Sequence, residues 1–328
     1  MRAAVYDRYG PPEVVQLREI PKPTPQANEV LIEVRATTVG AGDWRGRTLN
    51  MPAGFGLMGR LFFGISRPRQ PILGSELAGR VESVGKEVTR FKAGDEVFAF
   101  TGGRLGCHAE YKCFPQDEGV AQKPANLTWD EAAAMSSGGT TALHFLKKGN
   151  LRKGEKVLVN GASGGVGTAA VQLARHFGAD VTGVCSAGNA ELARSLGARR
   201  VIDYTQEDFT TNGETYDVIV DTAGTAPFSR SKDSLKEGGR LLLVLSGLAD
   251  LLLVPWVSMT SSRKVIAGPA TWCTEDLEFL AGLARAGEFR PVIDRRYPFG
   301  KIADAHRYVE TGRKKGNVII TVGNDDVT

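Results

Sequence analysis

The chain contains little cysteine: four residues in 328, at Cys107, Cys113, Cys185 and Cys273. Four cysteines in so long a chain do not indicate the disulfide framework that holds many secreted proteins together. Low cysteine usage without such a framework is typical of reducing compartments. The composition therefore predicts a cytoplasmic protein.

A long hydrophobic run is also missing. The longest apolar stretch, Leu241–Val257, is interrupted by Ser246, Gly247, Asp250 and Pro255. It is shorter than the roughly 20 residues that a membrane-spanning helix needs. The N-terminal sequence MRAAVYD turns polar at once, without the apolar core of a signal peptide. We therefore expect no membrane span, and we predict that Leu241–Val257 forms two buried segments.

Neither sign of charge is in large excess. The 41 Lys and Arg residues against 37 Asp and Glu residues give a net charge of +4. Spread over this length, the charge could help to attract an anionic ligand, but it does not require a nucleic-acid partner. We expect none.

Glycine is abundant. The 40 glycines in 328 residues make up about 12%, against roughly 7% on average. Glycine allows tight turns and lets the backbone approach a ligand closely. The chain length predicts about two domains at roughly 150 residues each.

The first 125 residues have the pattern of a β domain. Val30–Arg35 alternates apolar and polar residues, as a half-buried strand does, and Arg80–Val84 and Glu96–Phe100 are similar. Glycine and proline recur between these segments. Many short strands separated by such turns predict a barrel-like β domain.

From residue 126 onward, strands alternate with helices. Thr128 is a predicted N-cap, with Glu131 completing a capping box. The expected strands are Lys156–Asn160, Asp180–Cys185, Arg200–Ile202, Asp217–Asp221, Arg240–Leu245 and Lys264–Ala267. The expected helices are Gly165–Phe177, Ala190–Leu196, Phe228–Leu235 and Glu275–Ala286. This alternation predicts an α/β fold with a doubly wound parallel sheet. A last predicted strand, Val318–Val322, could join either domain.

A glycine-rich turn, GASGGVG at residues 161–167, lies between the first of these strands and its helix. It is a variant of G-x-G-x-x-G, with Ala162, Gly164 and Gly167 at the three fingerprint positions. Small residues let the backbone approach a pyrophosphate, and the helix N-terminus offers free N–H groups to the phosphates. We therefore predict a dinucleotide cofactor. The residues expected to bind it here are Ala162, Ser163, Gly164, Gly165 and Val166.

The end of the second strand of this fold separates NADH from NADPH. A carboxylate about 20 residues after the glycines would bind the ribose 2′-hydroxyl of NADH, but this chain has Cys185-Ser186-Ala187-Gly188-Asn189 there. Ser186 and Asn189 could bind a 2′-phosphate, and Arg194 could neutralise it. Arg194 could equally be an ordinary exposed helix residue. The missing carboxylate favours NADPH over NADH.

Several motifs together identify a family. They are MRAAVYDRYG at the start, PILGSELAGRVESVG at 71–85, FKAGDEV at 91–97, KPANL at 123–127, GASGGVG, and VIDY at 201–204. With them, nearly the whole chain resembles the medium-chain dehydrogenase/reductase superfamily, in its zinc-independent NADPH:quinone oxidoreductase branch (zeta-crystallin-like).

The resemblance implies a specific architecture. A Rossmann domain, residues 126–289, would be inserted into a GroES-like β-barrel catalytic domain formed by residues 1–125 and 290–328. The last strand would then belong to the catalytic domain, and the nicotinamide would meet its substrate between the domains. Relatives commonly form homodimers through the edge strand of the Rossmann sheet, here near Arg263–Ala267, so a homodimer is expected.

The zinc ligands of related dehydrogenases are absent from the matching positions. Those relatives use an early Cys, the His of a Gly-His-Glu motif, and a later Cys or Asp. Here the segment Val39–Trp44 has no Cys, and Ser75 stands where the His would be. Their structural zinc needs four closely spaced cysteines, but only Cys107 and Cys113 occur nearby, and the pair Cys107-His108 lacks partner ligands. We predict no metal site and no zinc.

Without zinc, no Lewis acid stabilises an alkoxide, so alcohol oxidation is disfavoured. Reduction of a quinone or an α,β-unsaturated carbonyl needs only alignment of the acceptor with the nicotinamide and a source of protons. We therefore predict an NADPH-dependent oxidoreductase acting on a small electrophilic acceptor. The alternatives are an NAD(P)-dependent alcohol or aldehyde oxidoreductase, and a non-catalytic NADPH-binding protein, because zeta-crystallin-like relatives also serve structural or RNA-binding roles.

Further contacts follow from the resemblance and from strand geometry. Thr140 matches a family threonine near the nicotinamide and phosphates, and Tyr204 matches a tyrosine that covers the adenosine phosphate. Asn317 lies in the C-terminal return that approaches the cofactor in relatives. Ala223 lies just past the fourth strand and Leu245-Ser246-Gly247 ends the fifth, at the edge where ligands bind in such sheets.

The catalytic candidates are fewer. Asp43 and Trp44 match a loop near the active site of relatives, but Gly40 replaces the family asparagine, and Asp43 could instead cap a helix. No general acid is apparent. The apolar segment Met51–Arg69 could line the acceptor pocket, form a lid, contact a second subunit or pack in the core.

Overall fold

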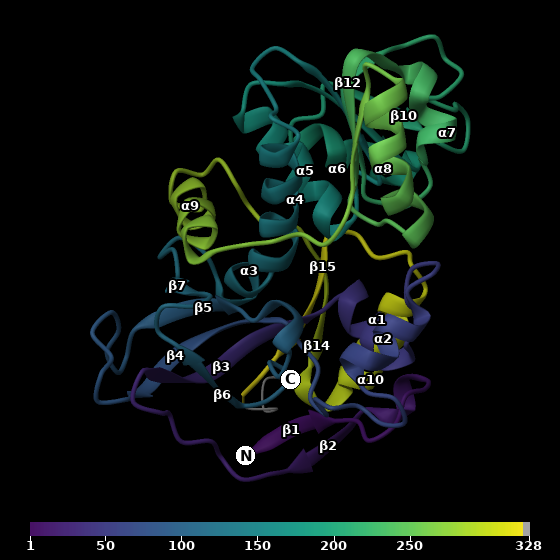
Figure 1. Ribbon diagram of the computed structural model, residues 1–328. Coiled ribbons are helices and arrows are strands. Elements are labelled where there is room, and N and C mark those ends of the chain that lie inside the picture. Colours follow the sequence, from purple (N-terminus) through teal and green to yellow (C-terminus); the bar gives the residue numbers. More distant parts are fainter. Residues whose placement is uncertain (324–328) are drawn as a thin grey trace. The chain divides into compact units, whose positions relative to one another are not determined.

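The computed structural model of the protein describes residues 1–323. The chain forms two compact units (Figure 1). The first unit contains residues 1–51, 56–137 and the chain from 273 onward, and the second contains residues 52–55 and 138–272. These bounds differ from the expected residues 126 and 289 at both junctions, because the helices on either side of the second unit pack in the first.

The first unit is built on a seven-stranded sheet, in the order β14-β15-β3-β4-β5-β7 with β6 paired to β3. The seven strands of this sheet are β3 (Glu29–Val39), β4 (Glu76–Val84), β5 (Glu96–Phe100), β6 (Tyr111–Pro115), β7 (Val120–Gln122), β14 (Ile293–Pro298) and β15 (Asn317–Thr321). Strands β1 (Arg2–Val5) and β2 (Gln16–Glu19) form a separate two-stranded sheet in the same unit. Its helices are α1 (Ala41–Thr48), α2 (Gly56–Phe63), α3 (Trp129–Ala133), α9 (Thr274–Arg285) and α10 (Ile302–Glu310). Strand β15 pairs antiparallel with β3, so the last strand belongs to this unit, as the resemblance implied.

The long strand β3 is the centre of the first unit. It pairs with β4, β6 and β15, and its apolar residues Val30, Ile32 and Val34 are almost completely buried. Helices α1 and α10 pack against each other at the end of this sheet (Figure 1).

Helices α3 and α9 belong to the first unit, where α3 packs against β3 and β4. In α3 the predicted capping box is confirmed: the backbone N–H of Thr128 donates to Glu131 Oε2 at 2.9 Å, and Glu131 N–H donates to Thr128 Oγ1 at 3.3 Å. Helix α9 packs against β7, where Thr274 Oγ1 accepts from the N–H of Gly119 at 3.1 Å.

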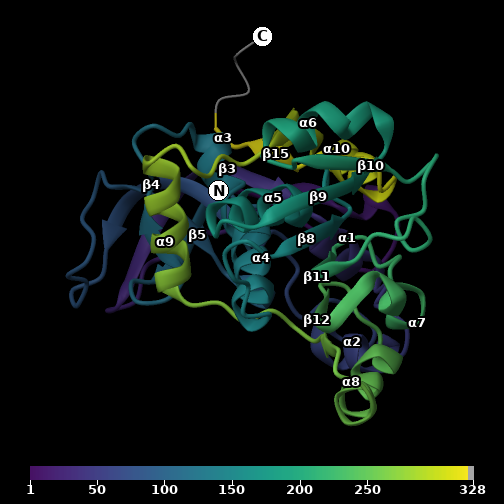
Figure 2. The same ribbon diagram turned by 90° about the horizontal axis from the view of Figure 1, so that it is seen from above.

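The second unit is a six-stranded sheet in which every paired neighbour is parallel, in the order β10-β9-β8-β11-β12-β13. Figure 2 shows the first five of these strands in this sequence. The strands are β8 (Lys156–Asn160), β9 (Asp180–Cys185), β10 (Arg200–Asp203), β11 (Tyr216–Asp221), β12 (Leu235–Leu243) and β13 (Lys264–Ile266). Helices α5 (Gly165–His176), α6 (Ala190–Ser195), α7 (Phe228–Ser231) and α8 (Leu248–Thr260) connect them, and α4 (Ser136–Lys148) enters the unit from the first. In chain order the arrangement is 3-2-1-4-5-6, that of the Rossmann fold. The predicted combination of a doubly wound sheet with a GroES-like β domain is confirmed.

Strands β8 and β9 have the predicted bounds, whereas β12 and α7 differ from prediction. Helix α7 ends at Ser231 and a 3-10 turn covers Lys232–Ser234. Strand β12 begins at Leu235, which pairs with Tyr216 before the register of the two strands shifts. This early pairing turns the end of the predicted helix into the start of a strand.

The prediction that Leu241–Val257 forms two buried segments is wrong for its second half. The end of β12 is buried, but α8 leaves 69% of Leu252 and 59% of Trp256 exposed, while Val257 is buried. The helix is apolar on several faces and buries only one of them, so hydropathy alone could not distinguish the exposed face. Within the part of the chain that the structure describes, no helix is both long and apolar enough to cross a membrane.

The segment Met51–Arg69 contains α2, which does not pack as core. Leu57, Met58, Leu61 and Phe62 are each at least half exposed, as is Ile65. Of the four uses expected for this segment, core packing therefore does not apply to these five side chains.

Candidate cofactor and active site

The glycine-rich turn lies between β8 and α5, as predicted. Gly161 has a φ of +81°, a left-handed conformation that favours glycine. A Cβ on Gly167 would lie 2.0 Å from the carbonyl oxygen of Gly161, so only glycine lets α5 approach the turn this closely. The turn thus requires small residues at both positions.

The N-terminus of α5 is open. Its N-cap, Gly164, has no side chain, and no side chain caps this helix end. The first N–H groups of a helix have no partner within the helix. Those of Gly165 and Val166, with the positive end of the helix dipole, therefore suit a phosphate group.

The two strands at the centre of the parallel sheet are joined at their carboxyl ends. Asn160 ends β8 and Asp221 ends β11, and Asn160 Nδ2 donates to Asp221 Oδ1 at 2.9 Å. Asp221 also accepts from the N–H groups of Ala223 at 3.1 Å, Gly224 at 3.0 Å and Ala226 at 2.9 Å. The strands that follow β8 in the chain are added first on one side of it (β9, β10) and then on the other (β11, β12, β13). The strand order therefore reverses between β8 and β11, which is where ligands bind in such folds. Asp221 therefore shapes the loop at that point, and it was not among the predicted site residues.

On the β9 side, three predicted cofactor residues come together. Asn189 Nδ2 donates to Ser163 Oγ at 3.1 Å and to Ser186 Oγ at 3.2 Å. This joins the phosphate turn to the segment that follows β9.

Arg194, in α6, is exposed. Its positive charge nevertheless lies close to the end of β9, where it opposes the rise in the pKa of Cys185 that burial and Asp203 produce. No ion pair of Arg194 occurs within residues 1–323.

The remaining predicted residues of the second unit lie at or near the same sheet edge. Tyr204 follows β10 and is 64% exposed, Ala223 lies beside the turn glycine Gly161, and Leu245 lies against Gly224. Ser246 Oγ accepts from Gly268 N–H at 3.3 Å, and Gly247 is the N-cap of α8.

Thr140, on α4, is buried within the second unit. Two residues before it, a Cβ on Gly138 would lie 2.7 Å from the carbonyl oxygen of Gly165. The first turn of α4 therefore packs directly on the start of α5.

In the first unit, Asp43 is engaged by backbone groups. It is almost completely buried, and its carboxylate accepts from the N–H of Gly40 and from the N–H of Gly74, both at 2.8 Å. It thus caps α1 and fixes the start of the Gly74-Ser75-Glu76 segment. Trp44 packs against the core with an indole Nε1 that has no hydrogen-bond partner in the described chain.

Glu76 has an unusual environment that the sequence patterns did not single out. It is 2% exposed, accepts from Thr38 Oγ1 at 2.5 Å and from the N–H of Ser137 at 2.6 Å. Burial raises the pKa of Glu76 to about 7, although both hydrogen bonds and the charge of Lys314 oppose the rise.

Two further titratable side chains are fully buried nearby. His108 Nε2 is 2.8 Å from the carbonyl oxygen of Thr38, and the rings of His108 and His306 meet edge to face with centroids 5.8 Å apart. Both nitrogen atoms of His306 lack a partner among the described residues. Burial, reinforced by His108 and Arg47, holds the pKa of His306 well below 6.5.

Asn317, the last predicted cofactor residue, is the first residue of β15. Its side-chain Nδ2 donates to the carbonyl oxygen of Val292 at 3.1 Å. Asn317 belongs to the first unit, whereas the other predicted cofactor residues belong to the second.

In residues 1–323, no group of three or more His, Cys, Asp or Glu side chains is arranged to hold a metal ion. The predicted absence of zinc stays a prediction.

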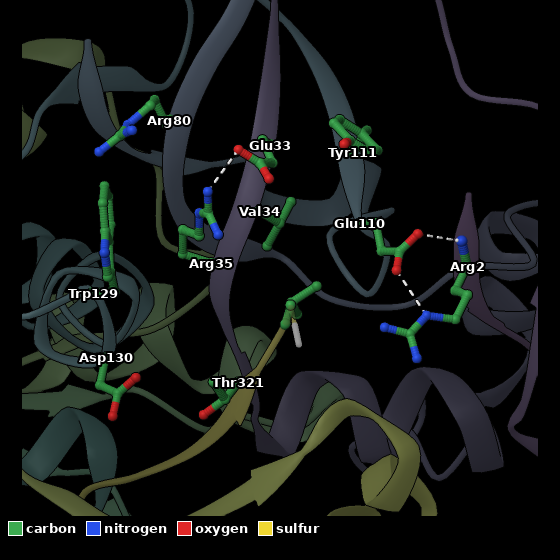
Figure 3. A pocket seen from close by; sticks show the side chains of 12 residues that line it. Arg2, Glu33, Val34, Arg35, Arg80, Glu110, Tyr111, Trp129, Asp130 and Thr321 are labelled. Atoms are coloured by element: carbon green, nitrogen blue, oxygen red, sulfur yellow. Dashed lines mark hydrogen bonds and ion pairs between the residues drawn. The ribbon is translucent and has the colours of Figure 1, made fainter. Parts of the chain in front are cut away.

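A hollow of about 550 Å³ lies elsewhere on the first unit (Figure 3). It contains the ion pairs Arg2–Glu110 at 2.7 Å and Arg35–Glu33 at 2.9 Å, and none of the predicted site residues lines it. Its charged groups therefore largely satisfy one another.

Two of the residues that sequence reasoning missed, Asn160 and Asp221, share a signal. Asn160 and Asp221 each end an otherwise apolar strand, VLVN and VIVD, and a buried polar residue at that place needs a partner. Glu76 and its partner Ser137 lie far apart in sequence, so no local pattern could pair them.

Comparison with known proteins places the chain in a family. Residues 26–188 match the alcohol dehydrogenase GroES-like domain, and residues 196–320 match the family described as zinc-binding dehydrogenase. The chain is 34% identical to 2-methylene-furan-3-one reductase of Solanum lycopersicum, over 98% of this chain and 79% of that protein. It is 31% identical to the chloroplast envelope quinone oxidoreductase homolog of Arabidopsis thaliana, over 98% of each.

A solved structure agrees with these matches. The quinone oxidoreductase of Coxiella burnetii superposes with a TM-score of 0.87 at 29% identity, covering 98% of this chain and 99% of that chain. The sequence matches and the shared fold extend over both units. The chain therefore belongs to the medium-chain dehydrogenase/reductase superfamily, in the branch that contains the quinone oxidoreductases.

Proposed function

We propose that the protein is an NADPH-dependent reductase that transfers hydride to a quinone or an α,β-unsaturated carbonyl without a metal ion. The observation that carries the proposal is the edge of the parallel sheet. There an uncapped helix N-terminus adjoins a Ser163–Asn189–Ser186 cluster, and β9 ends without a carboxylate.

The residues fit a dinucleotide. Gly161 and Gly167 leave room for close approach of a pyrophosphate, and the N–H groups of Gly165 and Val166 would donate to it. When bound, the nicotinamide supplies the hydride. The protein's part is to orient it, and Thr140 and the loop fixed by Asp221 are the groups that would do so.

The preference for NADPH rests on charge. Ser186 and Asn189 offer donors near the expected 2′ position, and the cation of Arg194 lies close enough to act on Cys185 at the end of β9. An acid at this position would repel a 2′-phosphate, and the strand ends in Cys185 and Ser186 instead.

The donor set argues against a catalytic zinc ion. Catalytic zinc sites use three protein ligands from His, Cys, Asp or Glu, and Ser75 stands where relatives have a His. The nearby carboxylates of Asp43 and Glu76 already accept hydrogen bonds from Gly74 and Ser137. Reduction of an activated acceptor does not need a Lewis acid, whereas alkoxide stabilisation does.

The acceptor class is supported by the relatives. One is named as a reductase of a methylene-furanone, an enone, and two are named as quinone oxidoreductases or a homologue of them. Quinones and enones share a carbonyl conjugated to the carbon that accepts hydride, so one geometry serves both.

The test is consumption of NADPH by the purified protein with a panel of quinones, enones and aldehydes, followed by the absorbance of the reduced nicotinamide. We expect turnover with quinones or enones above a protein-free control and little with aldehydes. If no acceptor increases NADPH oxidation although NADPH binds, the reductase proposal is wrong and the non-catalytic alternative replaces it.

Metal content gives a second test. We expect less than stoichiometric zinc after dialysis and unchanged turnover after treatment with a chelator. One tightly held zinc ion per chain, with activity lost on its removal, would instead support an alcohol dehydrogenase.

We also propose a homodimer formed through β13. This strand ends the six-stranded sheet, and its outer edge has no partner strand within the described chain. Sedimentation should give twice the mass of 35.2 kDa, and a proline at Val265 should lower the dimer fraction. The cytoplasmic location stays a prediction.

A further inference from the structure

We infer that Glu76 is a positioning residue for the cofactor, acting through the first turn of α4. The inference rests on the proposed nicotinamide binding but not on the identity of the acceptor. Its basis is a chain of three contacts, each within one unit of the fold.

The first contact joins Glu76 to α4. Glu76 Oε2 accepts from the N–H of Ser137 at 2.6 Å, one of the N–H groups that have no partner inside the helix. A carboxylate at a helix N-terminus is also favoured by the helix dipole. Glu76 therefore fixes where α4 begins.

The second contact joins the same turn to the phosphate site. Ser137 is followed by Gly138, whose Cα lies so close to Gly165 that a Cβ would be 2.7 Å from its carbonyl oxygen. Gly165 is the first residue of α5 and offers one of the N–H groups proposed to bind the pyrophosphate. A small shift of the first turn of α4 must therefore move either Gly138 or the turn on which it packs.

The third contact fixes Glu76 itself. Thr38 Oγ1 donates to Glu76 Oε1 at 2.5 Å, so each carboxylate oxygen has its own donor. The charged groups that act on Glu76 are Asp43, on α1, and Lys314, before β15, with the Cys107 thiol also within electrostatic range. Asp43 disfavours the ionised carboxylate and Lys314 favours it.

Stability does not explain this arrangement. Burial raises the pKa of Glu76 to about 7, so the ionised form is disfavoured by the folded protein. A buried charge that weakens the fold is weak evidence for a stabilising role. Burial disfavours the ionised form of Glu76, yet two hydrogen bonds hold its carboxylate in place. This combination points to a role of Glu76 in positioning α4.

The test measures the dissociation constant for NADPH, without an acceptor, in Glu76→Gln and in the wild type. Binding is followed by fluorescence between pH 5.5 and 8.5. The amide keeps one acceptor but removes the charge. At pH 8 we expect the variant to bind NADPH about tenfold more weakly, the loss typical of one charge-assisted hydrogen bond.

The pH dependence separates positioning from a structural effect. The 2′-phosphate of NADPH also titrates in this range, but it does so equally in both proteins, so the ratio of the two constants is used. This ratio should fall toward one as pH decreases through 7, because the wild-type Glu76 becomes protonated and loses its charge. A ratio of one at every pH, or a ratio independent of pH, would overturn the inference.

Glu131→Gln is the matched control. Glu131 is also a buried carboxylate at a helix N-terminus of the first unit, where it accepts from the N–H of Thr128 at 2.9 Å. It should leave the NADPH constant unchanged. An equal loss of affinity in this control would mean that any buried capping carboxylate has this effect, and the inference would fail.

If Glu76→Gln does not fold, Thr38→Val takes its place. This isosteric change removes only the donor to Oε1. Because that hydrogen bond favours the carboxylate, its loss should move the midpoint of the wild-type pH dependence to higher pH. An unchanged midpoint would contradict the inference.

Turnover keeps the two proposals distinct. Protein that binds NADPH with the expected pH dependence but reduces no acceptor would leave the inference standing and refute the proposed function. If the protein reduces acceptors but its affinity for NADPH is the same in Glu76→Gln and the wild type, the proposed function stands and the inference is refuted. Absence of binding to both NADPH and NADH would overturn both.

Discussion

Asn160 and Asp221 end neighbouring parallel strands and are joined by a hydrogen bond of 2.9 Å from Asn160 Nδ2 to Asp221 Oδ1. Both side chains are buried. Asp221 accepts three further backbone N–H groups, so one carboxylate holds together the loop at the point where the strand order reverses.

Replacing Asp221 by Asn should weaken both the fold and cofactor binding. The new amide N–H₂ would face either the N–H of Ala226 or Asn160 Nδ2, each of them a donor. An unsatisfied buried donor of this kind costs about 2 kcal/mol, measured as the free energy of unfolding in urea. The exposed Asp233→Asn should change neither property, and a variant of Asp221 as stable as the wild type would refute the role given to this carboxylate.

Arg194→Ala should lower the preference for NADPH over NADH by about tenfold, because the 2′-phosphate loses a nearby cation. The measurement is kcat/KM for both cofactors with one acceptor. Arg199→Ala is the control, since Arg199 is exposed and lies 3.7 Å from Asp180, at the other end of β9. Ser186→Asp should reverse the preference toward NADH by repelling the phosphate. Equal preference ratios in Arg194→Ala and the wild type would exclude Arg194 from the cofactor site.

Gly167→Ala should disrupt the phosphate turn. Its Cβ would lie 2.0 Å from the carbonyl oxygen of Gly161, and backbone must move to relieve the clash, at about 3 kcal/mol of stability. NADPH binding should be lost even where the protein remains folded. Gly282→Ala, in α9, meets nothing within 4 Å and should be neutral or stabilising. Normal binding by Gly167→Ala would show that the turn tolerates a side chain.

The stability of the wild type should fall in acid because of His306. Burial holds the pKa of its imidazole well below the usual 6.5, so below that pH the unfolded chain binds a proton that the folded chain does not. The resulting loss is about 1.4 kcal/mol per pH unit.

Glu76 acts in the opposite direction, since its raised pKa adds stability as the pH falls from 7 toward 4.5. The test is therefore the difference in unfolding free energy between His306→Phe and the wild type, which should grow in favour of the variant from pH 7 to pH 5. The exposed His176→Gln should show no such trend. A constant difference for His306→Phe would mean that His306 takes up a proton normally in the folded state.

Much of the second unit could be predicted from local sequence. The strands Lys156–Asn160 and Asp180–Cys185 matched in full, because short apolar runs bounded by glycine or polar residues leave few other places for a strand to start or end. The turn at 161–167 was also predictable from local sequence, because the backbone geometry that requires its glycines involves only a few neighbouring residues. The N-cap at Thr128 is equally local.

Long-range contacts account for what the sequence could not predict. Hydropathy marked Leu252 and Trp256 as buried, but the packing of α8 decides which of its apolar faces touches the sheet. Asp43 was a catalytic candidate by position. Its hydrogen bond from Gly40, 3 positions away, is the helix cap that the local sequence also allowed, whereas its hydrogen bond from Gly74, 31 positions away, depends on the tertiary structure.

The sequence alone determined the cofactor-binding turn, the alternation that builds the parallel sheet and the absence of a carboxylate after β9, because each depends on residues that are neighbours in the chain. Only the tertiary structure decided that Asn160 meets Asp221, that Asn189 bridges Ser163 and Ser186, and that Glu76 holds Ser137. Those pairs are separated by up to 61 positions. Hydrogen bonds between residues as distant as Asn160 and Asp221, or Glu76 and Ser137, form only when the elements that carry them have packed together.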